Sequence, residues 1–215
     1  MDIAIIDYKM SNLFSVNAAC KKVGLSTIIT SDKKEILNAK AAILPGVGAF
    51  GASMRNIVEL KLDNAIYDFI NTGKLFVGIC LGLQLLFDES DEYGINKGLG
   101  LIKGNVKKFK LMNKDKIKYP VPQIGWNKIK RNNISWENSL LDGLNYNDFM
   151  YFVHSYYVNP ENSDCILSST LYGNKEYCSS ITSENIFATQ FHPEKSGKSG
   201  LKIYKNIARR INKCH

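Results

Sequence analysis

The sequence of 215 residues predicts an α/β fold with a mostly parallel central sheet flanked by helices and an additional antiparallel portion. Up to Phe87, short apolar runs alternate with amphipathic helical segments, which is the pattern of βα units and a parallel sheet. After about residue 94, strand-like segments crowd together, which is typical of antiparallel pairing. The length suits one hydrophobic core, so we expect a single domain over residues 1–215.

The first part of the chain should contain four buried strands, around residues 2–7, 26–30, 41–44 and 75–80. Apolar residues at helical spacing follow the first strand from Leu13, and Gly24 is a plausible helix end. Two more helical stretches precede the fourth strand. Functional groups in such sheets gather beyond the carboxyl ends of the strands, where residues 45–48 and Cys80 are expected.

The second half offers further strand candidates, at residues 106–109, 124–130, 149–158, 164–170, 177–182 and 186–191. A polar, lysine-rich stretch at residues 110–119 is expected to be a hairpin or an exposed loop. The chain should close with an amphipathic helix, whose apolar face carries Leu201, Tyr204, Ala208 and Ile211.

Composition limits the class of function. The formal net charge is +8, but the lysines gather in two stretches without interleaved aromatics or a nucleic-acid motif, so we expect no nucleic-acid partner. With no apolar run of membrane-spanning length and a strand-like N-terminus, we expect a cytoplasmic protein without a membrane partner. The five cysteines lack paired CxxC spacing, which argues against disulfides and a metal site, and we expect no cofactor.

Cys80 lies between Gly78 and Gly82, where an apolar strand run changes to helical spacing. Glycines two residues before and after it permit the sharp turn of a nucleophile elbow, which exposes the central side chain above the sheet. Backbone N–H groups at the helix start would stabilise a thiolate there. The alternative interpretation is an ordinary core cysteine, because free cysteine is often buried.

A nucleophilic cysteine needs a base, and the chain contains three histidines. His215 is the last residue. His192 ends a predicted strand, and Glu194 two residues later could orient its imidazole. His154 lies in an aromatic run, where a packed structural histidine is the better interpretation. We therefore predict a catalytic triad of Cys80, His192 and Glu194.

The glycine-rich turn at residues 45–48 would let backbone N–H groups approach a ligand, although alone it could equally be an ordinary turn. Together with the cysteine elbow and the His192 segment, it resembles the class I, or triad, glutamine amidotransferases. Further segments resemble one branch of that class, the glutaminase subunits of imidazole glycerol phosphate synthase in histidine biosynthesis. These segments are residues 45–48, 122–127, 152–156 and 191–196.

The resemblance implies the class I glutamine amidotransferase fold and hydrolysis of glutamine to glutamate and ammonia through a γ-glutamyl thioester on Cys80. Backbone N–H groups of Leu81 and of the segment near Val47 would bind the oxyanion. By the same resemblance the substrate-binding residues are Gly46, Gly48, Gln84, Glu92, Ser155 and Tyr156. Asp91 could take the place of Glu92.

The resemblance also implies a heterodimer, in which ammonia passes to a cyclase (synthase) subunit that forms imidazole glycerol phosphate and aminoimidazole carboxamide ribotide. The residues facing that partner would be Asn12, Trp126, Tyr151 and Lys195. The chain departs from the family at its first turn, which usually reads Asp-Tyr-Gly-x-Gly-Asn, because Lys9 and Ser11 replace both glycines. Neither residue adopts positive φ as cheaply as glycine, so we expect a reshaped turn near the partner surface.

Three alternatives stay open at this point. A paralogous subunit could supply ammonia to an enzyme that amidates surface sugars, with an unchanged glutaminase centre. A non-catalytic regulatory or scaffolding subunit could retain the fold, although it would not need all of Cys80, His192 and Glu194. A different cysteine hydrolase on a related fold should lack Gln84 and the glycines around Val47.

Overall fold

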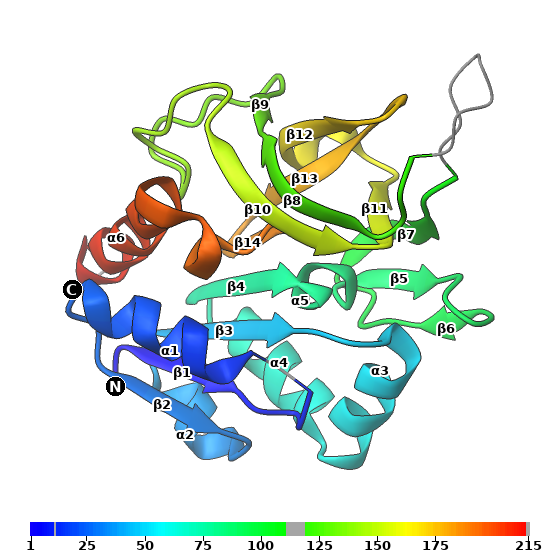
Figure 1. The fold of residues 1–215 in the computed structure, drawn as a ribbon. Helices are drawn as coiled ribbons and strands as arrows, with labels where there is room; N and C mark the ends of the chain where they lie inside the picture. The colour runs from blue at the N-terminus through cyan, green and yellow to red at the C-terminus, as the bar shows by residue number, and fades with distance from the viewer. Residues whose placement is uncertain (11, 111–118, 214–215) are drawn as a thin grey trace.

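The computed structural model describes residues 1–10, 12–110 and 119–213, and its eight-stranded main sheet has the order β2-β1-β3-β4-β14-β13-β12-β9 (Figure 1). The parallel part consists of β2 (Thr27–Thr30), β1 (Ile3–Ile6), β3 (Ala41–Gly46), β4 (Leu75–Cys80) and β14 (Ile186–Thr189). The antiparallel part adds β13 (Lys175–Ser183), β12 (Ile166–Tyr172) and β9 (Lys130–Arg131). The predicted fold class is therefore confirmed.

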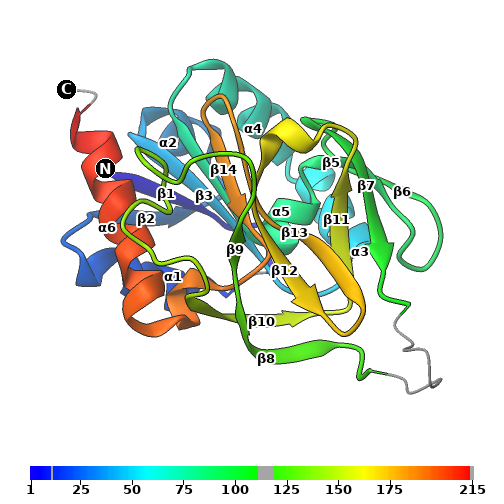
Figure 2. The ribbon, with the colours of Figure 1, turned by 90° about the horizontal axis from the view of Figure 1, so that it is seen from above.

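Helices cover both faces of the parallel part, which explains why its strands are continuous apolar runs. One face carries α1 (Leu13–Lys22) and α6 (Gly197–Lys213), and the other carries α2 (Lys33–Asn38), α3 (Phe50–Glu59) and α4 (Leu62–Asn71) (Figure 2). Val16 and Ile203 belong to the core on the first face, and Ile36 and Phe69 to the core on the second.

Two smaller sheets extend the fold beyond the carboxyl ends of the parallel strands (Figure 1). One contains β11 (Tyr156–Pro160), β7 (Ile102–Lys108), β5 (Phe87–Ser90) and β6 (Asn96–Lys97). The other pairs β8 (Gln123–Lys128) with β10 (Phe149–His154) in antiparallel register. Single 3₁₀ turns occur at η1 (Ser163–Cys165) and η2 (Pro193–Lys195).

Several segments differ from the sequence predictions. The helix after Cys80, α5, covers only Leu81–Gln84, because the chain then leaves the helix to exchange backbone hydrogen bonds with residues 98–102. The strand predicted at 149–158 is divided at Ser155 into β10 and β11, which join different sheets. The short elements α2, β5 and β6 had no prediction.

The first turn keeps a left-handed residue despite the missing glycine. Lys9 has a φ of 68°, and its N–H donates to Oδ1 of Asp7 at 2.8 Å, which helps to hold this conformation. Lys9 therefore occupies the left-handed region that favours glycine, although it carries a side chain. Ser11 and most of the predicted lysine-rich loop, residues 111–118, lie outside the described residues.

In the part of the chain that the structure describes, no helix is both long and apolar enough to cross a membrane. Cys20, Cys80, Cys165 and Cys178 are free thiols.

Candidate active site

Cys80 is the last residue of β4 and immediately precedes α5. Its φ of 55° is unusual for a side chain of this size, and such strained conformations concentrate at functional sites. The turn needs its glycines, because a Cβ at Gly82 would lie 1.8 Å from the carbonyl oxygen of Leu44. The elbow therefore places a nearly buried thiol, 6% exposed, at the carboxyl edge of the sheet.

His192 and Glu194 follow β14, the parallel neighbour of β4, so two distant segments meet at this edge. Nδ1 of His192 lies 2.8 Å from Oε1 of Glu194. Nε2 of His192 has no hydrogen-bond partner within normal distance among the described residues, yet Cys80 is close enough to affect its titration. Burial opposes the imidazolium charge, but the thiolate of Cys80 and the carboxylate of Glu194 together raise the pKa of His192 to about 10.

Gln190 is a site residue that the sequence analysis did not single out. It is completely buried, and its Nε2 donates to the sulfur of Cys80 over 3.6 Å. Its Oε1 accepts a hydrogen bond of 3.1 Å from Nε2 of Gln84. The available signal was its position directly after a strand that neighbours the strand of the nucleophile, since Thr189 is in register with Ile79.

A cavity of about 280 Å³ opens beside Cys80, which is near the lower limit for small-molecule pockets. It brings together most of the predicted site residues: Val47, Gly48, Cys80, Leu81, Gln84, Glu92, Ser155 and Tyr156. Asp91 is exposed and does not line the cavity, which favours Glu92 of the two acidic candidates. Glu92 also accepts the N–H of Phe50 at the start of α3.

The two predicted oxyanion donors differ in whether their N–H groups are already hydrogen-bonded. Leu81 begins α5, so its N–H belongs to the first helical turn, whose donors have no partner within the helix. The N–H of Val47 instead donates to the carbonyl oxygen of Met10 at 3.4 Å. Gly46 is in register with Cys80, and a Cβ there would lie 2.2 Å from the hydroxyl of Tyr8.

His154 lines this cavity, which His192 does not, but it lies in a different hydrogen-bonding environment. Its Nδ1 is 2.8 Å from the carbonyl oxygen of Tyr156, and its Nε2 is 3.2 Å from the hydroxyl of Tyr177. Burial lowers the pKa of His154 to about 4, although the hydrogen bond to Tyr156 opposes the shift. Unlike His192, it has no carboxylate partner among the residues that the structure describes.

The residues expected at a partner interface surround the His192 segment. Trp126 of β8 is 54% exposed and packs edge-on against Tyr151 of β10, with ring centroids 6.0 Å apart. Nζ of Lys195 lies 5.9 Å from the centre of the Tyr151 ring. Asn12 differs from these three, because its Nδ2 donates to Oε1 of Glu194 at 3.3 Å.

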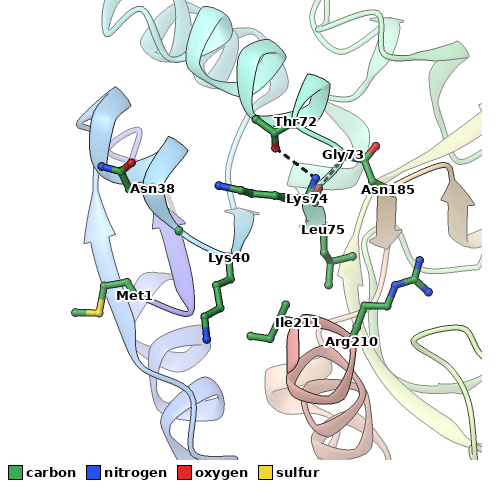
Figure 3. Close-up of a pocket in the computed structure, with 11 residues that line it drawn as sticks. Met1, Asn38, Lys40, Thr72, Gly73, Lys74, Leu75, Asn185, Arg210 and Ile211 are labelled. Carbon is green, nitrogen blue, oxygen red and sulfur yellow. Dashed lines mark hydrogen bonds between the residues drawn. The ribbon is translucent and has the colours of Figure 1, made fainter. Parts of the chain in front are cut away.

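A larger cavity, of about 570 Å³, lies at the opposite end of the strands, beside the first residue of β4 (Figure 3). Three cationic side chains line it, and each has a partner. Nζ of Lys74 donates to the carbonyl oxygen of Leu37 at 2.7 Å, Lys40 pairs with Asp2 at 3.0 Å, and Arg210 donates to the carbonyl oxygen of Asn138 at 3.4 Å. The residues that line this cavity include no cysteine or histidine, unlike those beside Cys80.

Comparison with known proteins agrees with this geometry. The family described as "Glutamine amidotransferase class-I" matches residues 4–211. The "Imidazole glycerol phosphate synthase subunit HisH" of Methanocaldococcus jannaschii is 48% identical over 205 residues, covering 95% of this chain and 97% of the relative. The protein of the same name from Aquifex aeolicus is 45% identical over 217 residues, covering 99% of each chain.

Solved structures support the fold. A crystal structure described as a glutamine amidotransferase aligns with a TM-score of 0.73 at 15% identity, covering 99% of this chain and 100% of that one. The glutaminase domain of CTPS from Trypanosoma brucei, solved with acivicin bound, aligns with a TM-score of 0.69 at 16% identity, covering 99% and 94%.

Proposed function

This chain belongs to the class I glutamine amidotransferases, and we propose that it is the glutaminase subunit of an imidazole glycerol phosphate synthase, with Cys80, His192 and Glu194 as its catalytic residues. The observation that carries the catalytic assignment is the buried His192–Glu194 pair beside the sulfur of Cys80. A nucleophile, a base and an orienting carboxylate in this order form a triad.

Acylation begins when the Cys80 thiolate attacks the side-chain carbonyl carbon of glutamine. A sulfur–carbon bond forms and the carbonyl oxygen becomes an oxyanion. His192, held protonated by its two negative neighbours, gives its Nε2 proton to the amide nitrogen. The carbon–nitrogen bond then breaks, which releases ammonia and leaves a γ-glutamyl thioester.

Deacylation reverses the role of the imidazole. Neutral His192 accepts a proton from water as the water oxygen attacks the thioester carbon. The carbon–sulfur bond breaks, the thiolate departs with its electron pair, and glutamate is released. Glu194 holds the ring through Nδ1 in both steps, so Nε2 keeps facing the reacting atoms.

The oxyanion needs preorganised hydrogen-bond donors. One of the two N–H groups proposed for this role already has a partner within the protein. The N–H of Val47 binds the carbonyl of Met10, so it must release that bond before it can serve an oxyanion. Gly46 and Gly48 on either side permit rotation of the peptide. We therefore expect slow glutamine hydrolysis in the isolated chain and a faster reaction when a partner favours the released state.

The partner in this proposal is a cyclase subunit bound as a heterodimer over the outward face of β8 and β10. That face bears the exposed side chains of Ile124, Trp126 and Phe149, which are 64%, 54% and 50% exposed. Contiguous apolar surface beside an active site is typical of a docking site. We place the pair in the cytoplasm, where free thiols such as Cys80 remain reduced.

Labelling and substitution test the catalytic assignment. A glutamine analogue carrying a diazoketone should modify Cys80 and spare the other four cysteines, Cys214 included, as mapped by mass spectrometry. Cys80→Ala and Cys80→Ser should abolish hydrolysis without lowering the unfolding temperature substantially. Substantial hydrolysis by Cys80→Ser would contradict the covalent mechanism.

A second experiment tests the partner. The kcat for glutamine hydrolysis is measured for the chain alone, with the candidate cyclase, and with the cyclase and its nucleotide ligand. Stimulation by the cyclase supports the proposal. Stimulation only by a sugar-amidating enzyme would replace it with the paralogue, and full activity of the chain alone would contradict the coupling.

A further inference from the structure

The sulfur of Cys80 has a neighbour besides His192. Nε2 of the completely buried Gln190 donates to it over 3.6 Å. Hydrogen bonds to the charged form of a group stabilise that form, and the low dielectric of a buried site strengthens them. The carbonyl oxygen of Val153 accepts the S–H of the neutral thiol over 3.9 Å, and it offers no donor to a thiolate.

The orientation of the Gln190 amide follows from its hydrogen bond with Gln84. Nε2 of Gln84 donates to the carbonyl oxygen of Tyr156 at 2.9 Å and to Oε1 of Gln190 at 3.1 Å. A carbonyl oxygen can only accept, so Gln84 must present its nitrogen there. The same nitrogen then requires an oxygen from Gln190, which leaves the nitrogen of Gln190 facing the sulfur.

We infer that Gln190 is a further catalytic residue, which donates an amide N–H to the Cys80 thiolate, and that Gln84 is the positioning residue that fixes this donor. The inference rests on the proposed role of Cys80 as nucleophile. Gln190 raises the fraction of thiolate before attack, and it receives the thiolate again when the carbon–sulfur bond of the thioester breaks. Gln84, for which the sequence analysis expected a substrate contact, here uses its amide nitrogen within the protein.

Alkylation of the isolated chain measures this effect without turnover. The rate of iodoacetamide labelling at Cys80, resolved by mass mapping, is followed against pH. In Gln190→Met we expect the midpoint to rise by about one pH unit, and the rate below the midpoint to fall about tenfold, as for loss of one hydrogen bond to a charged group. Gln84→Met should shift the midpoint in the same direction by a smaller amount.

Thr189→Val is the matched control. Thr189 is fully buried next to Gln190, but its hydroxyl donates to the carbonyl of Phe191 and not to the sulfur. Its loss should leave the midpoint unchanged. A midpoint in folded Gln190→Met equal to that of the parent chain would overturn the inference. An equal shift in Thr189→Val would also overturn it, because the effect would then reflect general loosening.

Gln190→Glu and Gln84→Met test the roles of the two glutamines further. If Gln190→Met does not fold, Gln190→Glu keeps the acceptor for Gln84 and places a carboxylate oxygen at the sulfur, so its midpoint should rise further; an unchanged midpoint would refute the role. For Gln84→Met in the stimulated complex, a fall in kcat with unchanged KM supports positioning. A raised KM with an unchanged alkylation midpoint would make Gln84 a substrate contact instead.

The outcome is separable from the proposed function. If Cys80→Ala retains hydrolysis, the nucleophile is misassigned, whatever the alkylation profile shows. If Cys80→Ala is inactive and Gln190→Met alkylates as the parent does, the glutaminase mechanism stands and only the role of Gln190 is lost.

Discussion

Nδ1 of His192 and Oε1 of Glu194 lie 2.8 Å apart, and the two side chains are only 2% and 1% exposed. A buried ion pair is costly unless its charges are matched and hydrogen-bonded. Here Cys80 lies close enough to favour the charged form of His192, and Asn12 donates a further hydrogen bond to Oε1 of Glu194, whereas Oε2 has no hydrogen-bond partner among the described residues. Asn12 precedes α1, so the N-terminal turn is directly connected to the triad.

Removing the charge of Glu194 should therefore weaken both the orientation and the protonation of His192. We expect Glu194→Gln to lower the pKa of His192 and to reduce kcat by about 10² to 10⁴, and His192→Asn to reduce it at least as much. The measurement is kcat in the stimulated complex. His154→Asn serves as the control and should change kcat far less, while a comparable loss at both histidines would show that the base is misassigned.

The lowered pKa of His154 makes stability depend on pH. In the unfolded chain this residue takes up a proton near its model value of 6.5, whereas in the folded chain it does so only near 4. Between these values the unfolded state binds more protons, so the free energy of unfolding should fall by up to about 3 kcal/mol as the pH drops from 6.5 to 4.

The test compares how much stability two proteins lose at acidic pH. Urea unfolding at neutral pH and at about pH 4 is compared for the parent chain and for His154→Gln, which has no titrating group at this position. The variant should lose less stability over this interval. Equal losses would mean that His154 titrates in the folded protein as it does in the unfolded one.

The parallel half of the sheet was predictable because its strands are apolar on both faces and alternate with amphipathic helices. The end of α5 was not, since residues 81–87 are almost uniformly apolar, and such a run fits a buried helix or a buried strand equally well. Backbone pairing of Leu85 and Leu86 with residues 99–102 decides between them. No sequence pattern within either segment predicts that the two segments pair.

At the site, the proximity of Cys80, His192 and Glu194 could be predicted from residue type and from their positions at strand ends. The contact of Gln190 with the sulfur could not, because it depends on the register of β14 against β4 and on an amide fixed by Gln84. The Val47–Met10 hydrogen bond was equally hidden, since it joins two turns that are distant in sequence.

The tight packing beneath the proposed oxyanion strand gives another prediction. A Cβ at Gly46 would lie 2.2 Å from the hydroxyl of Tyr8 and 2.8 Å from Cβ of Leu81. Gly46→Ala should therefore displace this strand, reduce hydrolysis and lower the free energy of unfolding by about 1 to 3 kcal/mol.

Tyr8→Phe removes one of these two clashes. The double variant should recover part of the lost stability relative to Gly46→Ala, which a double-mutant cycle measures as a coupling energy. Strict additivity of the two substitutions would show that the hydroxyl of Tyr8 does not limit the space at Gly46.

The last prediction concerns the exposed ring of Trp126. A large aromatic side chain at the centre of a docking surface is the type of residue that dominates binding energy. Trp126→Ala should weaken binding of the cyclase by about 2 kcal/mol, roughly thirtyfold in Kd, and raise the cyclase concentration needed for stimulation. Hydrolysis at saturating cyclase should change less than this affinity.

Val58→Ala provides the control, because Val58 is 54% exposed on α3, away from β8 and β10. Titration calorimetry gives both affinities, and an unchanged Kd for Trp126→Ala would place the docking surface elsewhere on the molecule.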